Sequence, residues 1–412
     1  MNSISVTAAE KTGNLNFVLV CVFIDMLGIG LIIPVLPVLV GALVQGRDQQ
    51  ALWFGIMAAV FGLMQFLCMP MLGAVSDRVG RRPVLLYSMA GMCANFLLTA
   101  LAPTLAFLFI GRVIGGMSSA SMSVASAYAA DISTPASRAK SFGKVGAAFG
   151  LGFICGPMLG GLLGQGNLRL PFYLAAALSA ANVVYGYCCV PESLSAARRK
   201  PLSLSRINPF AALGRLALRA DIRGLVFVFA LFSLAQVMLQ TTWVLYTTFR
   251  FNWTPLENGI ALFCVGLTAA VVQTGMFGPL IKRFGEVRLA LIGLTSGAVT
   301  FVLYGLATQG WMMYVFILFN LLSFATGPTL QAMMSKATPP DQQGALMGSL
   351  QAVSSLGVVF MPVLGTTILS ASSHLAPGDW RLGATYFVCA AMQALAIWVA
   401  LRYFNEKRKN TT

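Results

Sequence analysis

The chain carries few charged residues for its length. Asp, Glu, Lys and Arg make up only 9% of its 412 residues, whereas about a quarter of the residues in a soluble domain are charged. Hydrophobic residues account for 58%, and the mean hydropathy is +0.80. Apolar stretches of about 20 residues, the length that a helix needs to cross a bilayer, recur from end to end. This composition excludes a soluble protein and predicts an all-α integral membrane protein embedded in the lipid bilayer.

Groups that carry chemistry in enzymes are also scarce. The chain has one histidine, His374, and eight cysteines, which all lie in apolar stretches without the spacing of metal ligands. No nucleophile stands in a recognisable pattern with a base. We therefore expect no enzymatic activity, no metal and no cofactor.

The net charge of +15 is unevenly distributed along the chain. If the N-terminus is cytoplasmic, most Lys and Arg residues fall on cytoplasmic loops. The loops on the other side then hold only Arg47, Arg169, Arg250 and Arg381. Basic loops between membrane helices stay in the cytoplasm. The charge pattern thus predicts that both termini are cytoplasmic, and it argues against nucleic acid as a partner.

The apolar pattern predicts twelve transmembrane spans in two sets of six. They lie near residues 15–43, 51–72, 84–102, 105–129, 142–164, 171–190, 223–249, 257–280, 287–307, 311–334, 344–370 and 382–404. A polar, basic segment separates the two sets, and we expect a short amphipathic helix in it. The predicted organisation is an N-terminal six-helix bundle (1–190), a cytoplasmic linker (191–222) and a C-terminal six-helix bundle (223–412).

The two sets of spans are copies of one unit. Gly73 and Gly80 recur at a constant offset as Gly278 and Gly285, and several other Gly and Pro residues recur at the same offset. Repeats of this kind are typical of transporters.

A polar stretch between the second and third spans, Gly73 to Pro83, concentrates charge and glycine in what we expect to be a short turn. Its notable residues are Gly73, Asp77, Arg78, Gly80, Arg81 and Arg82. Scattered basic residues would suffice to anchor a cytoplasmic loop. A carboxylate among arginines, with flanking glycines, therefore favours an ion-paired cytoplasmic gate. Asp131, at the inner end of the fourth span, either pairs with these arginines or is a solvated loop acid.

Two charged residues lie well inside predicted spans, Asp25 in the first and Arg112 in the fourth. Asp25 stands roughly 15 Å into its span, at about 1.5 Å per residue. Charged side chains at this depth are costly and usually line a pathway. We expect the two to face one cavity and to couple proton binding to conformation, because Arg112 keeps its charge and can hold or release a carboxylate. The alternatives are a static ion pair and, for Asp25, a hydrogen bond to nearby backbone.

The fifth span is rich in glycine. Gly152, Gly156, Gly160 and Gly164 stand four residues apart, so a neighbouring helix can approach closely along this face. Pro157 adds a kink, and Gly161 extends the small surface. A packing face explains the pattern, and a hinge or seal between the two halves is compatible with it.

Polar and aromatic side chains at membrane depth are candidates for substrate contacts. They are Gln65, Asn95, Gln236, Gln240, Trp243 and Gln273. With the methionines near them, such a set suits an adaptable pocket for a partly aromatic small molecule. For each residue singly, ordinary helix packing is the more common explanation.

Several stretches together match a known family. They are 73–83, Asp25-x-x-Gly28-x-Gly30-x-x-x-Pro34-x-x-Pro37, Gly111-Arg112, Gly152 to Gly161 around Gly156-Pro157, Trp243-Val-Leu-Tyr246 and Gln342-Gln-Gly-Ala345. On these the whole chain resembles the major facilitator superfamily, and within it the drug:proton antiporters of the tetracycline-resistance branch.

The resemblance implies two six-helix bundles around a central cavity that opens alternately to each side, in the inner membrane of a bacterial cell. It implies a proton-coupled antiporter that exports drug-like or tetracycline-like molecules. Asp25 and Arg112 would couple the proton, and the 73–83 stretch with Asp131 would control the gate. The partners implied are a small-molecule substrate and protons, and we expect a monomer.

Three positions depart from the pattern of that branch. The tetracycline exporters carry an acid in the third span, a histidine in the eighth and an acid in the ninth. This chain has Asn95, Ala269 and Gly297 at those positions, whereas Gln273 matches. The substrate is therefore left open. An exporter of an endogenous metabolite is one alternative, and a non-transporting membrane sensor is another from a different class.

Overall fold

The computed structural model describes residues 15–134, 137–199, 222–339 and 342–409, and every regular element within these ranges is helical. In this part of the chain, 11 helices are long and apolar enough to cross a membrane. One of them, Pro255–Leu306, has 52 residues, about twice the number that one crossing needs. It holds the predicted eighth and ninth spans, and its helical geometry breaks at Gly285. The twelve predicted crossings are thus confirmed.

Eight helices form the N-terminal half. They are α1 (Leu15–Ile32), α2 (Leu36–Gly41), α3 (Arg47–Val79), α4 (Arg81–Leu101), α5 (Leu105–Ser118), α6 (Ser121–Ile132), α7 (Arg138–Gly166) and α8 (Leu170–Cys189). The first span is broken between α1 and α2, beside Pro34 and Pro37, where the missing proline N–H groups predict a bend. The fourth span is broken between α5 and α6, at Ser119 and Ala120. Each break leaves backbone groups of the helix ends without intrahelical partners.

The C-terminal half follows a short helix, η2 (Ala196–Arg198). Its elements are α11 (Arg223–Phe251), α12 (Pro255–Val271), a π-helical turn η3 (Val272–Met276), α13 (Phe277–Leu306), α14 (Gly310–Phe319), η4 (Asn320–Ala325), α15 (Thr326–Lys336), α16 (Gln343–Ser372), η6 (Trp380–Gly383) and α17 (Ala384–Lys409). Most of the linker, residues 200–221, lies outside the described residues. The amphipathic helix expected in the linker therefore stays a prediction.

The stretch from Gly73 to Pro83 is not the turn that the sequence suggested. α3 continues to Val79 and α4 begins at Arg81, so only Gly80 interrupts the helices. A helix of 33 residues spans about 50 Å, which exceeds a hydrocarbon core of about 30 Å. Its polar last turns therefore stay helical beyond the membrane. Gly80 has φ +113°, and its repeat counterpart Gly285 has φ +72°, so the internal repeat includes the left-handed backbone that reverses the chain.

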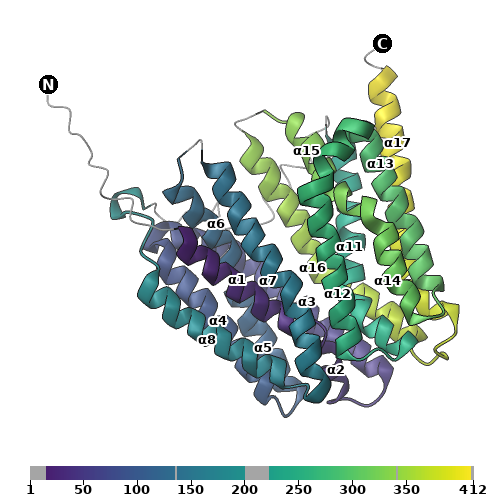
Figure 1. Cartoon of the computed structure of the whole chain (residues 1–412), viewed down its shortest axis with the longest axis horizontal. Coiled ribbons are helices and arrows are strands. Elements are labelled where there is room, and N and C mark those ends of the chain that lie inside the picture. Colours follow the sequence, from purple (N-terminus) through teal and green to yellow (C-terminus); the bar gives the residue numbers. More distant parts are fainter. Residues whose placement is uncertain (1–14, 135–136, 200–221, 340–341, 410–412) are drawn as a thin grey trace.

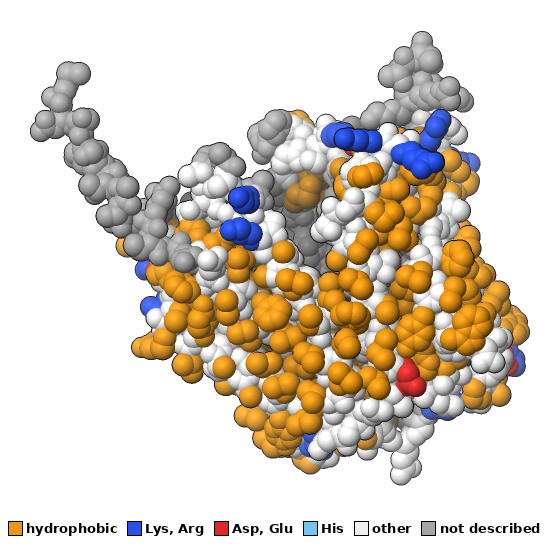
Figure 2. All heavy atoms as spheres, viewed as in Figure 1, with side chains coloured by type: hydrophobic (Ala, Val, Ile, Leu, Met, Phe, Trp, Pro, Cys, Tyr) orange, Lys and Arg blue, Asp and Glu red, His pale blue; other side chains and the backbone are white. Residues whose placement is uncertain are grey.

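The surface of the bundle is apolar, as Figure 2 shows. Large hydrophobic side chains are strongly exposed, for example Phe319 at 71%, Tyr187 at 67% and Trp311 at 65%. On the face shown, Lys and Arg gather at the end of the bundle where α1 begins and α17 ends, called the terminal end below. This is the surface of a protein that is surrounded by lipid and has one basic end.

Each half packs around apolar cores of its own, and the halves lie side by side (Figure 1). They meet along α3 and α16, and along α7 and α12. Away from the terminal end, at what we call the opposite end, the contact is close. A Cβ atom built on Gly161 would lie 2.5 Å from the carbonyl oxygen of Pro255. Arg47 Nη1 also donates to the Phe249 carbonyl oxygen across the two halves, at 3.3 Å.

Toward the terminal end the halves separate. A Cβ atom built on Gly146 of α7 or Gly348 of α16 would meet no atom of another element within 4 Å. Figure 2 shows a hollow between the halves at this end. The structure is therefore open at the terminal end and closed at the opposite end.

Candidate functional site

Asp25 lies on α1 and is only 2% exposed. Its Oδ1 atom has no hydrogen-bond partner within the described part of the chain. Ser121, the first residue of α6, lies beside Asp25, and its Oγ also has no partner there. Asp25 thus faces the break in the fourth span, where the N-terminal end of α6 favours negative charge. The backbone hydrogen bond considered as an alternative for Asp25 is not among the contacts that the structure shows.

Arg112 lies on α5 and is 5% exposed. Its Nη2 donates to Asn95 Oδ1 at 2.8 Å and to Thr99 Oγ1 at 3.4 Å, both on α4. Its guanidinium also lies over the ring of Phe61, 5.7 Å from the centroid. Within the described residues, no carboxylate lies within ion-pairing distance of it.

The structure does not bring Asp25 and Arg112 together. The first contacts α6 and the second contacts α4, and the static ion pair considered as an alternative is not formed in this conformation. The positions of the two residues in the sequence predicted that they lie at a similar depth in the membrane. They did not predict the direction in which each side chain points from its helix.

Arg81 is the centre of the predicted gate. Its Nη1 lies 2.7 Å from Asp77 Oδ1, and its Nε lies 2.9 Å from Asp131 Oδ2. It also donates to Ser76 Oγ at 2.7 Å, and it is only 8% exposed. The pairing expected between Asp131 and the arginines is therefore present. One guanidinium ties the end of α3 and the end of α6 to the start of α4.

Glu192, just after α8, completes this network, and sequence reasoning missed it. Its carboxylate accepts from the backbone N–H groups of Arg81 at 2.8 Å and Arg82 at 3.1 Å. These are the first N–H groups of α4, which otherwise have no intrahelical acceptor. A Cβ atom on Gly80 would push the same carboxylate aside, and the φ angle of +113° itself favours glycine there. The sequence did contain a signal for this contact. Glu192 is an acid directly after the sixth predicted span, and Gly80, the residue before α4, has no side chain that could cap the helix.

We expect Glu192→Gln to weaken this junction. Glutamine keeps the shape and the acceptor oxygen but removes the charge that interacts with the N-terminus of α4. The loss is about 1 kcal/mol, or roughly a fivefold faster thermal unfolding of the purified protein. Glu406→Gln makes the same change at an exposed site on α17 and should leave the rate unchanged. Equal rates in the two variants would show that the Glu192 charge does not stabilise the junction.

The other two arginines of the stretch act separately. Arg82 Nη2 donates to the Tyr187 carbonyl oxygen, and its guanidinium lies 5.4 Å from the centroid of the Tyr187 ring, which ties α4 to α8. Arg78, in the last turn of α3, is exposed.

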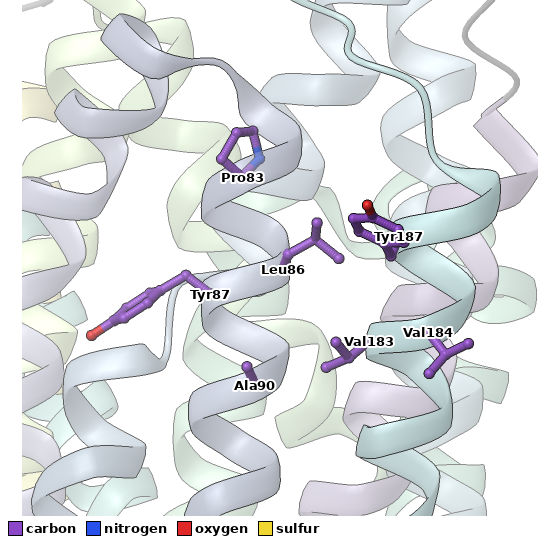
Figure 3. A pocket seen from close by; sticks show the side chains of 7 residues that line it. All are labelled: Pro83, Leu86, Tyr87, Ala90, Val183, Val184 and Tyr187. Atoms are coloured by element: carbon purple, nitrogen blue, oxygen red, sulfur yellow. The ribbon is translucent and has the colours of Figure 1, made fainter.

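An apolar groove of 520 Å³ runs between α4 and α8, with Pro83 and Tyr187 in its wall (Figure 3). Tyr187 and Val184 in its wall are 67% and 62% exposed, so the groove faces lipid and is not a substrate site.

The glycines of α7 face two different helices. Those spaced four apart pack on α1. A Cβ atom on Gly152 would lie 2.6 Å from the Phe23 carbonyl oxygen, one on Gly156 2.6 Å from Gly30 Cα, and one on Gly160 against the Leu31 carbonyl oxygen. This confirms the packing face within the N-terminal half.

The contact between the halves uses the other side of α7. Gly161 lies against Pro255 of α12, and the Pro157 carbonyl oxygen lies against Gly259. Gly152, Gly156 and Gly160 of the predicted stripe thus pack within the N-terminal half, whereas a Cβ atom on Gly164 would lie 3.4 Å from Pro255 Cβ in the other half. The periodicity identified a helix face, but only the fold shows which neighbour covers it.

The candidate substrate residues are placed in different surroundings. Gln65 donates to Ser119 Oγ at 2.9 Å, and Asn95 accepts from Arg112. Trp243 is 3% exposed and packs edge-on against Tyr304, 5.3 Å between ring centroids, in the core of the C-terminal half. Gln236 is half-buried on α11, whereas Gln240 and Gln273 are exposed. In this conformation Trp243 has the surroundings of a core residue.

A buried polar cluster in the C-terminal half was also missed. Gln393 is fully buried, and neither atom of its amide has a partner in the described residues; Ser323 Oγ nearby has none either. A Cβ atom on Gly297 would lie 2.6 Å from Gln393 Oε1 and 2.9 Å from Ser323 Oγ. The space beside Gly297 is therefore filled by neutral polar groups from α17 and η4. No run of local sequence connects these positions, so pattern reading had no signal for them.

Comparison with known proteins decides the family. A model described as the Major Facilitator Superfamily matches residues 18–275 and 225–412. The chain belongs to the Major Facilitator Superfamily. It is a membrane transporter rather than an enzyme, and its two six-helix halves are the fold of that superfamily.

The transporter is similar along most of its length to curated bacterial proteins. It is 38% identical to the class C tetracycline resistance protein of Escherichia coli, over 92% of this chain and 95% of that protein. It is also 38% identical to the class G protein of Vibrio anguillarum, over 90% and 94%. Among solved structures, the human organic anion transporter MFSD10 matches with a TM-score of 0.70 and 24% identity, over 96% of this chain and 100% of that chain.

Proposed function

We propose that this transporter is a proton-coupled antiporter that exports drug-like or tetracycline-like small molecules from the cytoplasm. The observation that carries the proposal is Asp25, the one buried carboxylate among the described residues, whose Oδ1 has no hydrogen-bond partner among them. An ionised carboxylate there is costly, and binding a proton removes the cost. The similarity to tetracycline resistance proteins supports drugs as the substrate class.

The conformation fits the uptake step of export. The basic terminal end is assigned to the cytoplasm by the distribution of Lys and Arg, and this is the end at which the halves separate. Substrate enters from there and displaces the proton from Asp25. Protons entering from outside then protonate Asp25 and return the transporter to this state. Such a cycle requires that the two conformations bind proton and substrate with different affinities.

The gate at the terminal end belongs to the same cycle. In the open state Arg81 holds Asp77 and Asp131 within the N-terminal half. We place the latch of the outward-open state at the junction of α3 and α4, with Asp77, Arg78 and Asp131 holding the cytoplasmic side closed. Of these three residues, Arg78 is the exposed one.

The proposal also includes organisation and location. The domains are the N-terminal bundle (1–190), the linker (191–222) and the C-terminal bundle (223–412). The protein lies in the bacterial inner membrane as a monomer with both termini in the cytoplasm. Protons and a small molecule are its partners, and no cofactor is needed.

Proton movement in inverted membrane vesicles tests the function. The vesicles carry the protein and an acid interior, and chemically varied drugs, tetracycline among them, are added outside. Export by antiport would release protons and raise the internal pH only for true substrates. If correctly inserted protein gives no response to any drug, the exporter of an endogenous metabolite becomes the better assignment, and a panel of cell metabolites in the same vesicles would test it.

Acid residues outside the membrane should not carry the transported proton. Arg381 donates hydrogen bonds to the Asp379 carboxylate and lowers its pKa to about 2. The carboxylate therefore stays ionised as pH falls, and the favourable contact is lost only near pH 2. We expect Asp379→Asn to leave the dependence of transport on external pH between 5 and 8 unchanged. A displaced pH profile in vesicles would show that Asp379 takes part in coupling.

A further inference from the structure

Arg112 is a buried cation without a buried counter-charge. It is 5% exposed, and Asn95, its main partner, is 1% exposed. The partner is an amide, so the hydrogen bond of 2.8 Å between Arg112 Nη2 and Asn95 Oδ1 supplies no negative charge. Within the described residues, no carboxylate forms an ion pair with Arg112. A charge buried without compensation is strongly unfavourable.

The same two side chains also carry donors without acceptors. Arg112 Nε and Asn95 Nδ2 are both buried and lack a partner in the described part of the protein. Each buried donor left without an acceptor costs free energy. The site therefore presents two hydrogen-bond donors and a net positive charge, and what it lacks is one acceptor that carries negative charge.

The surroundings of the two donors are closely packed, so an anion bound there would have to be small. Asn95 packs on the bare backbone of Gly115, where a Cβ atom would lie 3.0 Å from Nδ2. The ring of Phe61 lies 5.7 Å from the guanidinium carbon on α3. A monatomic anion or the end of a carboxylate has the required size, charge and acceptor capacity.

We propose that Arg112 and Asn95 form a binding site for a small monovalent anion. The anion supplies the charge that a carboxylate at position 95 would supply. It is either an inorganic halide or the carboxylate of a transported molecule, and both have the same chemistry at this site. The proposal goes beyond drug export, and its test uses binding, so its failure and that of the transport proposal can be told apart.

Thermal unfolding of the purified protein tests the site. Chloride, acetate and a bulky organic sulfonate are compared as sodium salts at equal ionic strength. An anion that binds the folded state should raise the unfolding midpoint saturably by about 5 °C over the sulfonate. A rise with chloride assigns the site to an inorganic anion, and a rise with acetate alone assigns it to carboxylates. No rise with either anion would overturn the proposal.

Two variants localise the effect. Asn95→Asp places a carboxylate beside Arg112, so the midpoint should become independent of the anion. Arg381→Gln is the control. It removes a positive charge from an exposed arginine paired with Asp379, so it should keep the wild-type anion dependence. A folded Asn95→Asp protein that is still stabilised by the anion as strongly as the wild type would show that the anion binds elsewhere.

Discussion

Asp25→Asn should abolish proton-coupled export without preventing insertion of the protein into the membrane. Among the 12 acidic residues of the chain, Asp25 is the only one well inside a predicted span. Asparagine has nearly the same shape but cannot take up or release a proton. In inverted vesicles, proton release on addition of substrate should fall to the level of vesicles that lack the protein. Because substrate exchange between the two sides needs no net proton movement, counterflow of substrate should persist.

The control for Asp25→Asn is Asp48→Asn. Asp48 is exposed in the first turn of α3, at the opposite end of the bundle, and the chemical change is the same. This variant should transport like the wild type. Full proton-coupled activity in Asp25→Asn would mean that the proton is carried by another group, and the proposed mechanism would then be wrong.

Gly259→Val should prevent closure of the opposite end and stop transport. A Cβ atom on Gly259 would collide with the Pro157 carbonyl oxygen and lie 3.2 Å from Gly161 Cα. Both are backbone atoms of α7, so no side-chain rotation relieves the clash. Alternating access requires α7 and α12 to meet in the conformation described here, and valine would disfavour that conformation by several kcal/mol. The transporter should therefore remain open to the opposite side.

Distances between spin labels on Asp48 and Trp311, measured in a variant without the eight native cysteines, would detect the change. Both positions are exposed, one in each half. The distance distribution should shift to longer values in Gly259→Val. Gly166→Val is the matched control, because Gly166, at the end of α7, has no neighbouring atom within 4 Å of a built Cβ. An unchanged distance in Gly259→Val, with normal transport, would show that this contact is not the seal.

The sequence predicted the crossings and part of the ion-pair network at the junction of α3 and α4. Runs of apolar residues determine where helices cross a bilayer, and Pro34, Pro37 and the repeated glycines determine where they break or reverse. The pair of Asp131 with Arg81 was also within reach, because a lone acid and a cluster of arginines at the same membrane face attract each other. The length of α3 could not be predicted, because hydropathy shows where the chain leaves the lipid and not where a helix ends.

By itself the sequence determined the fold class, the internal repeat and the intramembrane position of Asp25 and Arg112, since each follows from local composition or spacing. Tertiary structure alone decided that Arg112 binds Asn95, that Glu192 caps α4, and that Gly161 and Gly164 are the α7 glycines that meet the other half. These contacts depend on how each helix is rotated about its axis and which helix it packs against. Both are set by the packing of segments far apart in the chain.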